Sequence, residues 1–202
     1  MKQFTAEQIV SNYQALGYRL KTGILEINLF GIRNSDSQAN TFDDSVGCIY
    51  KDANNVWRIL QFPATTDPGV FYREHPINVD GTIIMVPGQH LDCYQVGLHR
   101  GYEAFQQVGK MGYVRDKNKN KILDYILYLV KTNIIYQIAA TNIHYSNPVS
   151  ESQNVDKWSA GCQVLSLAKN LKLLLNLAKE GIRMFKYKNR FDYTLFELKN
   201  MK

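Results

Sequence analysis

The sequence lacks the long apolar runs that would place it in a membrane. Its longest apolar stretches, such as residues 173–178, are far too short to span a bilayer. Residues 1–18 contain no uninterrupted apolar run of signal-peptide length. We therefore expect a product made in the cytoplasm, which reaches any substrate outside it by lysis or secretion rather than through a cleaved signal.

Cysteine is also scarce. The three cysteines have neither the even number of a disulfide scaffold nor the CxxC or Cys/His spacing of a structural zinc site. Cys48 and Cys93 lie in apolar, strand-like sequence and are expected to be small buried hydrophobes. Cys162 lies in a polar, loop-like sequence and needs a separate explanation.

Blocks of like charge are missing as well. The net charge is +6, but the basic residues are spread out, with only mild clusters at 115–121 and 183–190. No helix-turn-helix or ribonucleoprotein motif accompanies them, so we expect solvated surface charge and no nucleic-acid partner. Hydrophobic residues make up 45% and charged residues 21%, as in ordinary globular proteins.

No linker, repeat or low-complexity tract divides the chain, which predicts one domain over 1–202 with an N-terminal helical extension at about 1–20. Thr5 and Gln8 have capping-box spacing and predict a helix over 5–16 that ends at Gly17. Short β-rich runs separated by turn residues then predict a mainly β (α+β) fold. These runs are 24–32, 47–52, 56–62, 81–86, 94–98, 113–116 and 134–145, and the clearest turns are 34–40, 52–55, 65–69 and 78–81.

Three further elements are predicted towards the C-terminus. Residues 102–109 are compatible with a short helix. A second helix is expected from its cap at Ser166 to about Lys179, with Gly181 ending it. Residues 191–198 alternate in polarity and predict a closing strand.

The chemistry is concentrated in residues 142–163. His144 ends an apolar run, a polar loop follows, and the chain returns through Trp158 into Ser159-Ala160-Gly161-Cys162. Gly161 permits backbone angles that bring the chain close to a ligand, and amides of residues 160–162 can point at a developing oxyanion. A thiol is only slightly ionised at neutral pH and benefits from an adjacent imidazole. The segment therefore predicts a cysteine nucleophile, Cys162, with His144 as its base.

The order His144, fourteen intervening residues, then Ser159-x-Gly161-Cys162 resembles the signature of the L,D-transpeptidase (YkuD-type) catalytic domain. Residues 65–69 (TTDPG) also resemble that family's Thr-Pro-x-Gly segment. The resemblance implies a β-sandwich fold, a peptidoglycan stem peptide of the cell wall as substrate, and no metal or organic cofactor. It leaves the oligomeric state open.

The resemblance also implies roles. Cys162 would attack a peptide carbonyl to form a thioester, His144 would take and return the proton, and the carbonyl of Tyr145 would orient the imidazole. Ser159 and Gly161 would shape the turn. We expect the sulfur and a ring nitrogen of His144 to lie within roughly 3–4 Å of each other.

The sequence departs from the family at two places. Ala160 replaces a histidine, and Gln163-Val164 replace a hydrophobic residue followed by Arg or Asn. His99, Gln163 and Trp158 are therefore the candidates for substrate-side contacts. Because side chains that would select an amine acceptor are missing, we expect hydrolysis, as a carboxypeptidase or endopeptidase, to exceed cross-linking.

Two other classes of protein are alternatives for the whole chain. A structural or binding module of a phage or secretion particle could keep the fold without turnover. A papain-like protease has its cysteine before its histidine, and the order here is reversed.

Several smaller motifs have plainer explanations. Asp116, Asn118, Asn120 and Asp124 have the spacing of a calcium loop, but Lys121 and Leu127 stand where glycine and glutamate belong, so a polar turn is expected. A turn is also expected at Asp43–Asp44. His75 and His90 are expected to be surface loop residues.

Overall fold

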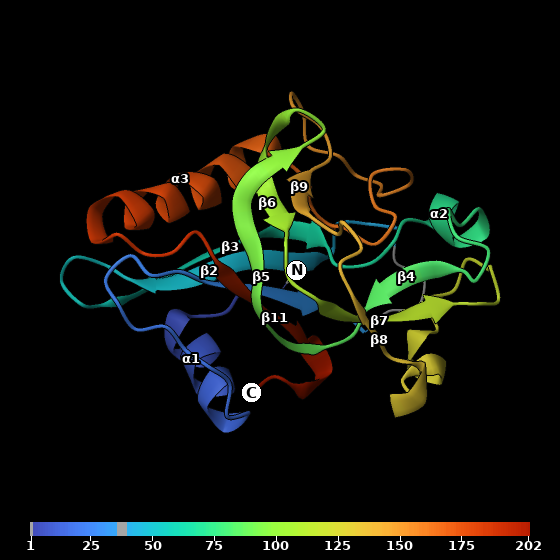
Figure 1. Ribbon diagram of the computed structural model, residues 1–202, viewed down its shortest axis with the longest axis horizontal. Coiled ribbons are helices and arrows are strands. Elements are labelled where there is room, and N and C mark those ends of the chain that lie inside the picture. The colour runs from blue at the N-terminus through green and yellow to red at the C-terminus, as the bar shows by residue number, and fades with distance from the viewer. Residues whose placement is uncertain (1, 36–39) are drawn as a thin grey trace.

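The computed structural model describes residues 2–35 and 40–202, so part of the predicted turn at 34–40 lies outside the described residues. The chain is mainly β (Figure 1). The strands are β1 (Asn28–Arg33), β2 (Asp44–Lys51), β3 (Trp57–Thr65), β4 (Thr82–Met85), β5 (Gly88–His99), β6 (Tyr102–Gln107), β7 (Met111–Asp116), β8 (Ile135–Gln137), β9 (Ile143–Tyr145), β10 (Gln163–Leu165) and β11 (Phe191–Glu197). The helices are α1 (Ala6–Ala15), α2 (Val70–Glu74) and α3 (Ala168–Phe185), with 3₁₀ turns η1 (Tyr125–Tyr128), η2 (Lys131–Asn133) and η3 (Leu198–Asn200).

Eight strands close into a barrel in the order β1-β11-β5-β6-β9-β10-β3-β2, and β4-β7-β8 form a separate sheet. The predicted mainly β class, with an N-terminal helix and a helix after Cys162, is confirmed, but a closed barrel takes the place of the predicted sandwich. Most neighbouring strands are antiparallel. The pairs β1–β11 and β9–β10 are parallel.

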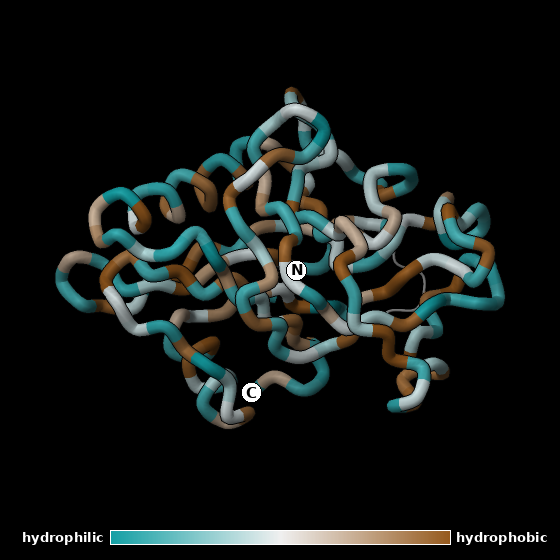
Figure 2. The backbone as a smooth tube through the Cα atoms, viewed as in Figure 1, coloured by the Kyte–Doolittle hydropathy of each residue, from teal (hydrophilic) through white to brown (hydrophobic). Residues whose placement is uncertain are grey.

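The two long helices cover different parts of the barrel (Figure 1). Along β1, Leu29 points into the barrel core while Phe30 packs outside it against α1, as the alternation of a strand requires. Thr5 caps α1 with the predicted capping box. Figure 2 shows hydrophobic and hydrophilic residues alternating around the turns of α3, whose apolar face joins the barrel core. No helix in the described part of the chain is long and apolar enough to cross a membrane.

Two sequence predictions in this region are wrong. Residues 102–109 are not helical, because Arg100 and Gly101 take positive φ values of 48° and 90° and turn β5 back into β6 as a two-residue hairpin. His90 is not a surface residue. It is 7% exposed, and its ring bridges the carbonyl of Val86 and the amide of Gly112.

The prediction for the second helix is correct in its core face and wrong at both ends. Leu171, Leu174 and Leu175 are buried as expected. Ser166 does not cap α3, since its hydroxyl donates to Glu151 instead. Gly181 lies inside the helix and does not end it. A glycine is required there because the backbone of Leu25 packs directly against it.

We predict that Gly181→Ala destabilises the protein although alanine is the better helix former. A Cβ at this position would lie 2.4 Å from the carbonyl oxygen of Leu25. Overpacking of this kind costs about 1–3 kcal/mol and outweighs the gain of about 1 kcal/mol in helix propensity. Urea unfolding measures the difference. Asn176→Ala, on the exposed face of α3, is the control and should be neutral or stabilising; equal effects of the two changes would contradict the prediction.

Candidate active site

The site is built on the parallel pairing of β9 with β10. Val164 lies opposite His144, and the amide of Gln163 donates to the carbonyl of Asn142 over 3.0 Å. Side chains two residues apart share a face of a strand. Cys162, two residues before Val164, therefore lies on the same face as His144.

His144 is neutral and has one defined tautomer. The ring is 3% exposed, and its Nδ1 lies 2.9 Å from the carbonyl oxygen of Tyr145. A carbonyl can only accept, so Nδ1 carries the proton and Nε2 keeps its lone pair. Burial lowers the pKa of His144 to about 3, and the neighbouring His99 and Arg100 act in the same direction. The imidazole is therefore uncharged at neutral pH.

The Cys162 thiol is uncharged too. Its Sγ lies 3.7 Å from the carbonyl oxygen of Ala140, which it uses as acceptor. Burial raises the pKa of Cys162 to about 11, against the opposing effects of the Asn142 amide and the Arg100 guanidinium. Among the described residues no hydrogen bond joins the thiol to His144, and the expected distance of roughly 3–4 Å between the sulfur and a ring nitrogen stays a prediction.

The turn before Cys162 is held by its own serine. Ser159 Oγ donates to the Cys162 carbonyl over 2.8 Å and accepts from the Gly161 amide over 3.2 Å. Gly161 has φ of 125°, and a Cβ there would lie 2.9 Å from the carbonyl oxygen of Ile83. Within the described ranges, the amides of Ala160 and Cys162 donate no hydrogen bond. These two amides, and not that of Gly161, are available to an oxyanion.

The second motif segment, residues 65–69, braces this turn. The Gly69 amide donates to the Ser159 carbonyl over 2.9 Å, and a Cβ on Gly69 would lie 2.0 Å from the carbonyl oxygen of Asp156. Asp67 is buried and pairs with Arg33, whose Nε lies 2.7 Å from its Oδ1. The two segments that were singled out separately in the sequence are therefore in direct contact.

His99 stacks on His144. The ring centroids are 4.2 Å apart and the planes differ by 7°. Asn142 donates from Nδ2 to His99 Nδ1 over 2.9 Å, and its Oδ1 accepts from the Gln107 amide, which fixes the orientation of the amide group. His99 consequently carries its proton on Nε2 and offers an N–H donor, as its predicted substrate-side role requires.

Two clefts meet at Cys162. One has a volume of about 560 Å³ and the other about 290 Å³, and both are lined by Cys162, Ala160, His99 and Arg100. Tyr145 and Trp158 line only the smaller cleft. Arg115 adds a positive charge to the larger one and Lys157 to the smaller one, whereas no Asp or Glu of the described residues lines either.

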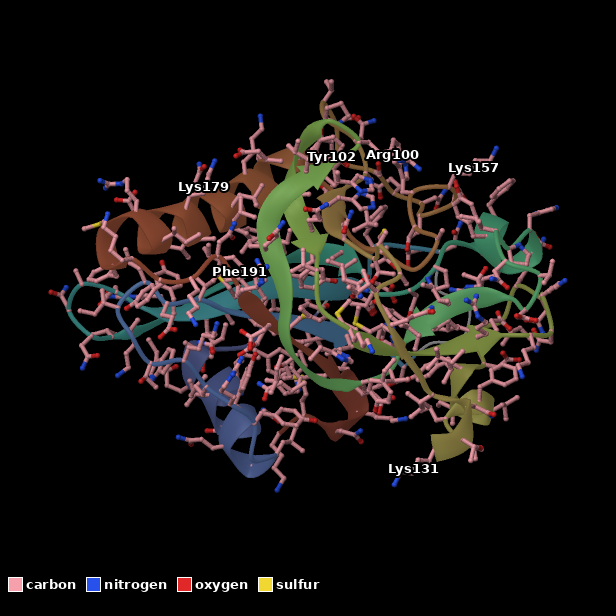
Figure 3. All side chains as sticks on the ribbon, in the orientation of Figure 1. Arg100, Tyr102, Lys131, Lys157, Lys179 and Phe191 are labelled. Atoms are coloured by element: carbon pink, nitrogen blue, oxygen red, sulfur yellow. The ribbon has the colours of Figure 1, made fainter. Side chains whose placement is uncertain are left out.

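Arg100 is the site residue that the sequence did not reveal. It lies at the end of the β5–β6 hairpin with Tyr102 (Figure 3), and no ion pair with it is present in the described residues. The adjacent glycine was a signal for the hairpin turn, and the prediction for His99 placed this segment near the site, but it did not name Arg100.

Gln163 is a correction to the predicted site. It is fully buried, and its Oε1 accepts from the Tyr193 hydroxyl over 2.9 Å. Successive side chains of a strand alternate, so Cys162 faces the clefts and Gln163 faces the barrel core. Gln163 therefore stabilises the fold and does not touch the clefts.

No family model, curated protein or solved structure matches this chain. The candidate site rests on its own geometry.

We predict that Cys162 is alkylated by iodoacetamide at a rate that keeps rising with pH beyond 9. Burial disfavours its thiolate, so below a pKa of about 11 the reactive fraction increases about tenfold for each pH unit. Cys48 and Cys93 are buried, and burial raises the pKa of both thiols, so they should stay protected in the folded protein. Mass spectrometry of the labelled peptides measures the three rates. A plateau for Cys162 near pH 7 would indicate a preformed thiolate–imidazolium pair and contradict this description.

Proposed function

We propose that the protein is a cysteine-dependent acyl-transfer enzyme acting on peptidoglycan stem peptides, with Cys162 as nucleophile and His144 as base. The observation that carries the proposal is a buried imidazole with a bare Nε2 on the same face as a thiol that opens onto two clefts. Catalytic bases are held in this way, by a carbonyl that fixes the tautomer.

In the first step the thiol turns from the Ala140 carbonyl towards His144. Cys162 Sγ attacks the carbonyl carbon of the substrate while its proton passes to His144 Nε2. The C–N bond of the resulting tetrahedral intermediate then breaks, and the leaving amine takes the proton from Nε2. A thioester on Cys162 remains, and the imidazole is neutral again.

The negative charge of the intermediate needs donors that are not already occupied. The amides of Ala160 and Cys162 meet this condition, and the Nε2–H of His99 and the guanidinium of Arg100 border the same space. Removing one oxyanion donor typically lowers kcat by about 10²–10³-fold. The missing histidine at position 160 is thus replaced in function by His99, which comes from another strand.

The charge of the clefts supports an anionic substrate. Arg100, Arg115 and Lys157 are not balanced by acidic side chains in the lining, and unbalanced cations in a concave site attract carboxylates. Stem peptides carry such carboxylates, and the motif resemblance points to the same substrate.

The same charges favour hydrolysis of the thioester over cross-linking. An amine acceptor arrives as an ammonium ion, and neither cleft offers it a carboxylate among the described residues. Water needs no such partner. The enzyme therefore acts mainly as a carboxypeptidase or endopeptidase.

We predict that Cys162→Ala and His144→Gln each abolish the release of shortened or uncoupled muropeptides from purified peptidoglycan. Loss of either member of a nucleophile–base pair commonly lowers kcat by more than about a thousandfold. Mass analysis of the digest measures the products. Cys93→Ala is the matched control; it should keep its activity, with a stability loss of about 1–2 kcal/mol. Turnover retained in Cys162→Ala would refute the mechanism, and an inactive but folded wild-type protein would favour a binding module.

A D-amino acid supplied with a stem tetrapeptide tests the fate of the thioester. We predict that the shortened peptide exceeds the exchanged peptide even at millimolar acceptor, because the ammonium group finds no carboxylate in the clefts. The ratio of the two products is read by mass spectrometry. A majority of exchanged peptide would make the enzyme a transpeptidase.

A further inference from the structure

A second pocket lies between the C-terminal end of α3 and the segment that precedes β1. Its volume is about 470 Å³, which is within the range of small-molecule sites. None of the residues that line it also lines a cleft at Cys162. Figure 3 shows Phe191, which lines this pocket, well separated from Arg100. The pocket is therefore a separate site, which the proposed acyl transfer does not use.

The pocket combines an apolar interior with a basic rim. Ile27, Ala178 and Phe191 are buried in it, and the partly buried Leu25 and Ile182 extend the apolar surface. An apolar lining with a few charged groups suits a ligand that has an apolar body and an ionic group. Five cations and two carboxylates complete the lining: Arg19, Lys21, Lys186, Lys188 and Arg190, with Glu26 and Asp92.

Most of the positive charge is not neutralised within the protein. Arg19 forms ion pairs with Asp92 and Asp192. The other four cations of the lining form no ion pair within residues 2–35 and 40–202. The second carboxylate, that of Glu26, accepts the Gly23 amide over 3.3 Å. The rim therefore offers net positive charge to an anion.

Two of the four cations are held in place by the fold. Lys21 Nζ donates to the Arg190 carbonyl over 3.1 Å and lies 6.0 Å from the centre of the Phe191 ring. Arg190 Nη1 donates to Gln95 Oε1 over 2.6 Å and to the Asn189 carbonyl over 2.9 Å. In the described part of the chain, its Nε and Nη2 groups make no hydrogen bond. A guanidinium with N–H groups to spare is suited to a phosphate.

Lys186, directly after α3, has a backbone conformation that favours glycine. Its φ is 57°, in the left-handed region. A residue of this kind at the end of a helix is usually glycine, because a Cβ is strained there. The helix dipole favours a cation at this end, but it does not account for Lys21, Lys188 and Arg190, which belong to other segments. A strained residue that also lines the pocket indicates a function for its side chain.

An exposed aromatic ring adjoins the pocket. Phe185, the last residue of α3, is 39% exposed and stacks on Tyr187 of the pocket lining, with ring centroids 5.6 Å apart. Exposed aromatic side chains beside lysines and arginines are typical of surfaces that bind anionic membranes. A purely polar phosphate polymer would meet the cations and leave the apolar interior unfilled, whereas an acyl chain would fill it.

We propose that this pocket binds an anionic phospholipid, with its phosphate held by Lys21, Lys186 and Arg190 and part of an acyl chain against the apolar interior. Arginine binds a phosphate through two N–H groups, and lysine binds it as a point charge. Phe185 then lies in the headgroup region of the membrane. The basic residues at 183–190, for which the sequence alone favoured solvated surface charge, thus acquire a partner.

The test is sedimentation of the protein with vesicles at low ionic strength. Vesicles of phosphatidylglycerol and phosphatidylcholine in equal parts should carry the protein down, and vesicles of phosphatidylcholine alone should not. Lys21→Gln and Lys188→Gln should each weaken binding about fivefold, the effect of one cation near an anionic surface. Lys131→Gln removes an exposed lysine from η2, far from the pocket (Figure 3), and should bind like the wild type.

Lys186→Gly separates a binding role from a structural one. Glycine relieves the left-handed strain, so Tm should stay unchanged or rise while vesicle binding falls about fivefold. Unchanged binding in both Lys186→Gly and Lys21→Gln would overturn the proposal, as would equal binding to the two kinds of vesicle.

Two soluble probes distinguish a phospholipid from other phosphates. Dihexanoyl phosphatidylglycerol, kept below its micelle concentration, should displace the protein from vesicles because it carries both the phosphate and acyl chains. Inorganic phosphate at the same concentration should not. Equal displacement by the two probes, no displacement by the lipid, or a DNA duplex that binds as tightly as the vesicles would overturn the proposal. Cys162→Ala should bind vesicles like the wild type, and no readout uses peptidoglycan, so the result is independent of the proposed enzyme activity.

Discussion

The pairing of β9 with β10 is the interaction on which both the barrel and the candidate site depend. Each strand has three residues, yet the two complete the ring: Ile143 pairs with Phe105 on one side, and Val164 and Leu165 pair with Thr65 and Ala64 on the other. Parallel neighbours cannot be joined by a tight hairpin and need a crossover. Residues 146–162 make that crossover, and its last four residues form the turn that carries Cys162.

Because the β9–β10 pairing is so short, side-chain hydrogen bonds are needed to stabilise it. Inside the barrel, Gln163 accepts a hydrogen bond from the Tyr193 hydroxyl. Just beyond the strands, the Ser146 hydroxyl donates to the Ser166 carbonyl over 3.0 Å. This explains why a polar residue follows the cysteine. A glutamine that satisfies a buried tyrosine hydroxyl stabilises the closure, and it is therefore unavailable for the substrate contact inferred from its position in the motif.

Local chemistry was readable from the sequence, and long-range placement was not. The capping box at Thr5 and most strands follow from neighbouring residues alone. The helix expected at residues 102–109 is wrong because the composition of this segment suits a helix, whereas its pairing with β5 makes it a strand. Likewise, the contact of His144 with the Tyr145 carbonyl was expected from the motif. The stacking of His99 on His144 and the position of Arg100 beside Cys162 depend instead on how the β5–β6 hairpin, about forty residues earlier, folds against β9 and β10.

Burial is the main cause of both pKa shifts in the site, and it defines what the proposed catalysis would have to supply. Burial makes both the thiolate and the imidazolium unfavourable, so the resting pair is neutral and the thiol can rest on the Ala140 carbonyl. Charge then arises only when a substrate carbonyl is present to receive it. In the proposed mechanism the free amides and Arg100 stabilise that developing charge, which is how binding energy would increase kcat.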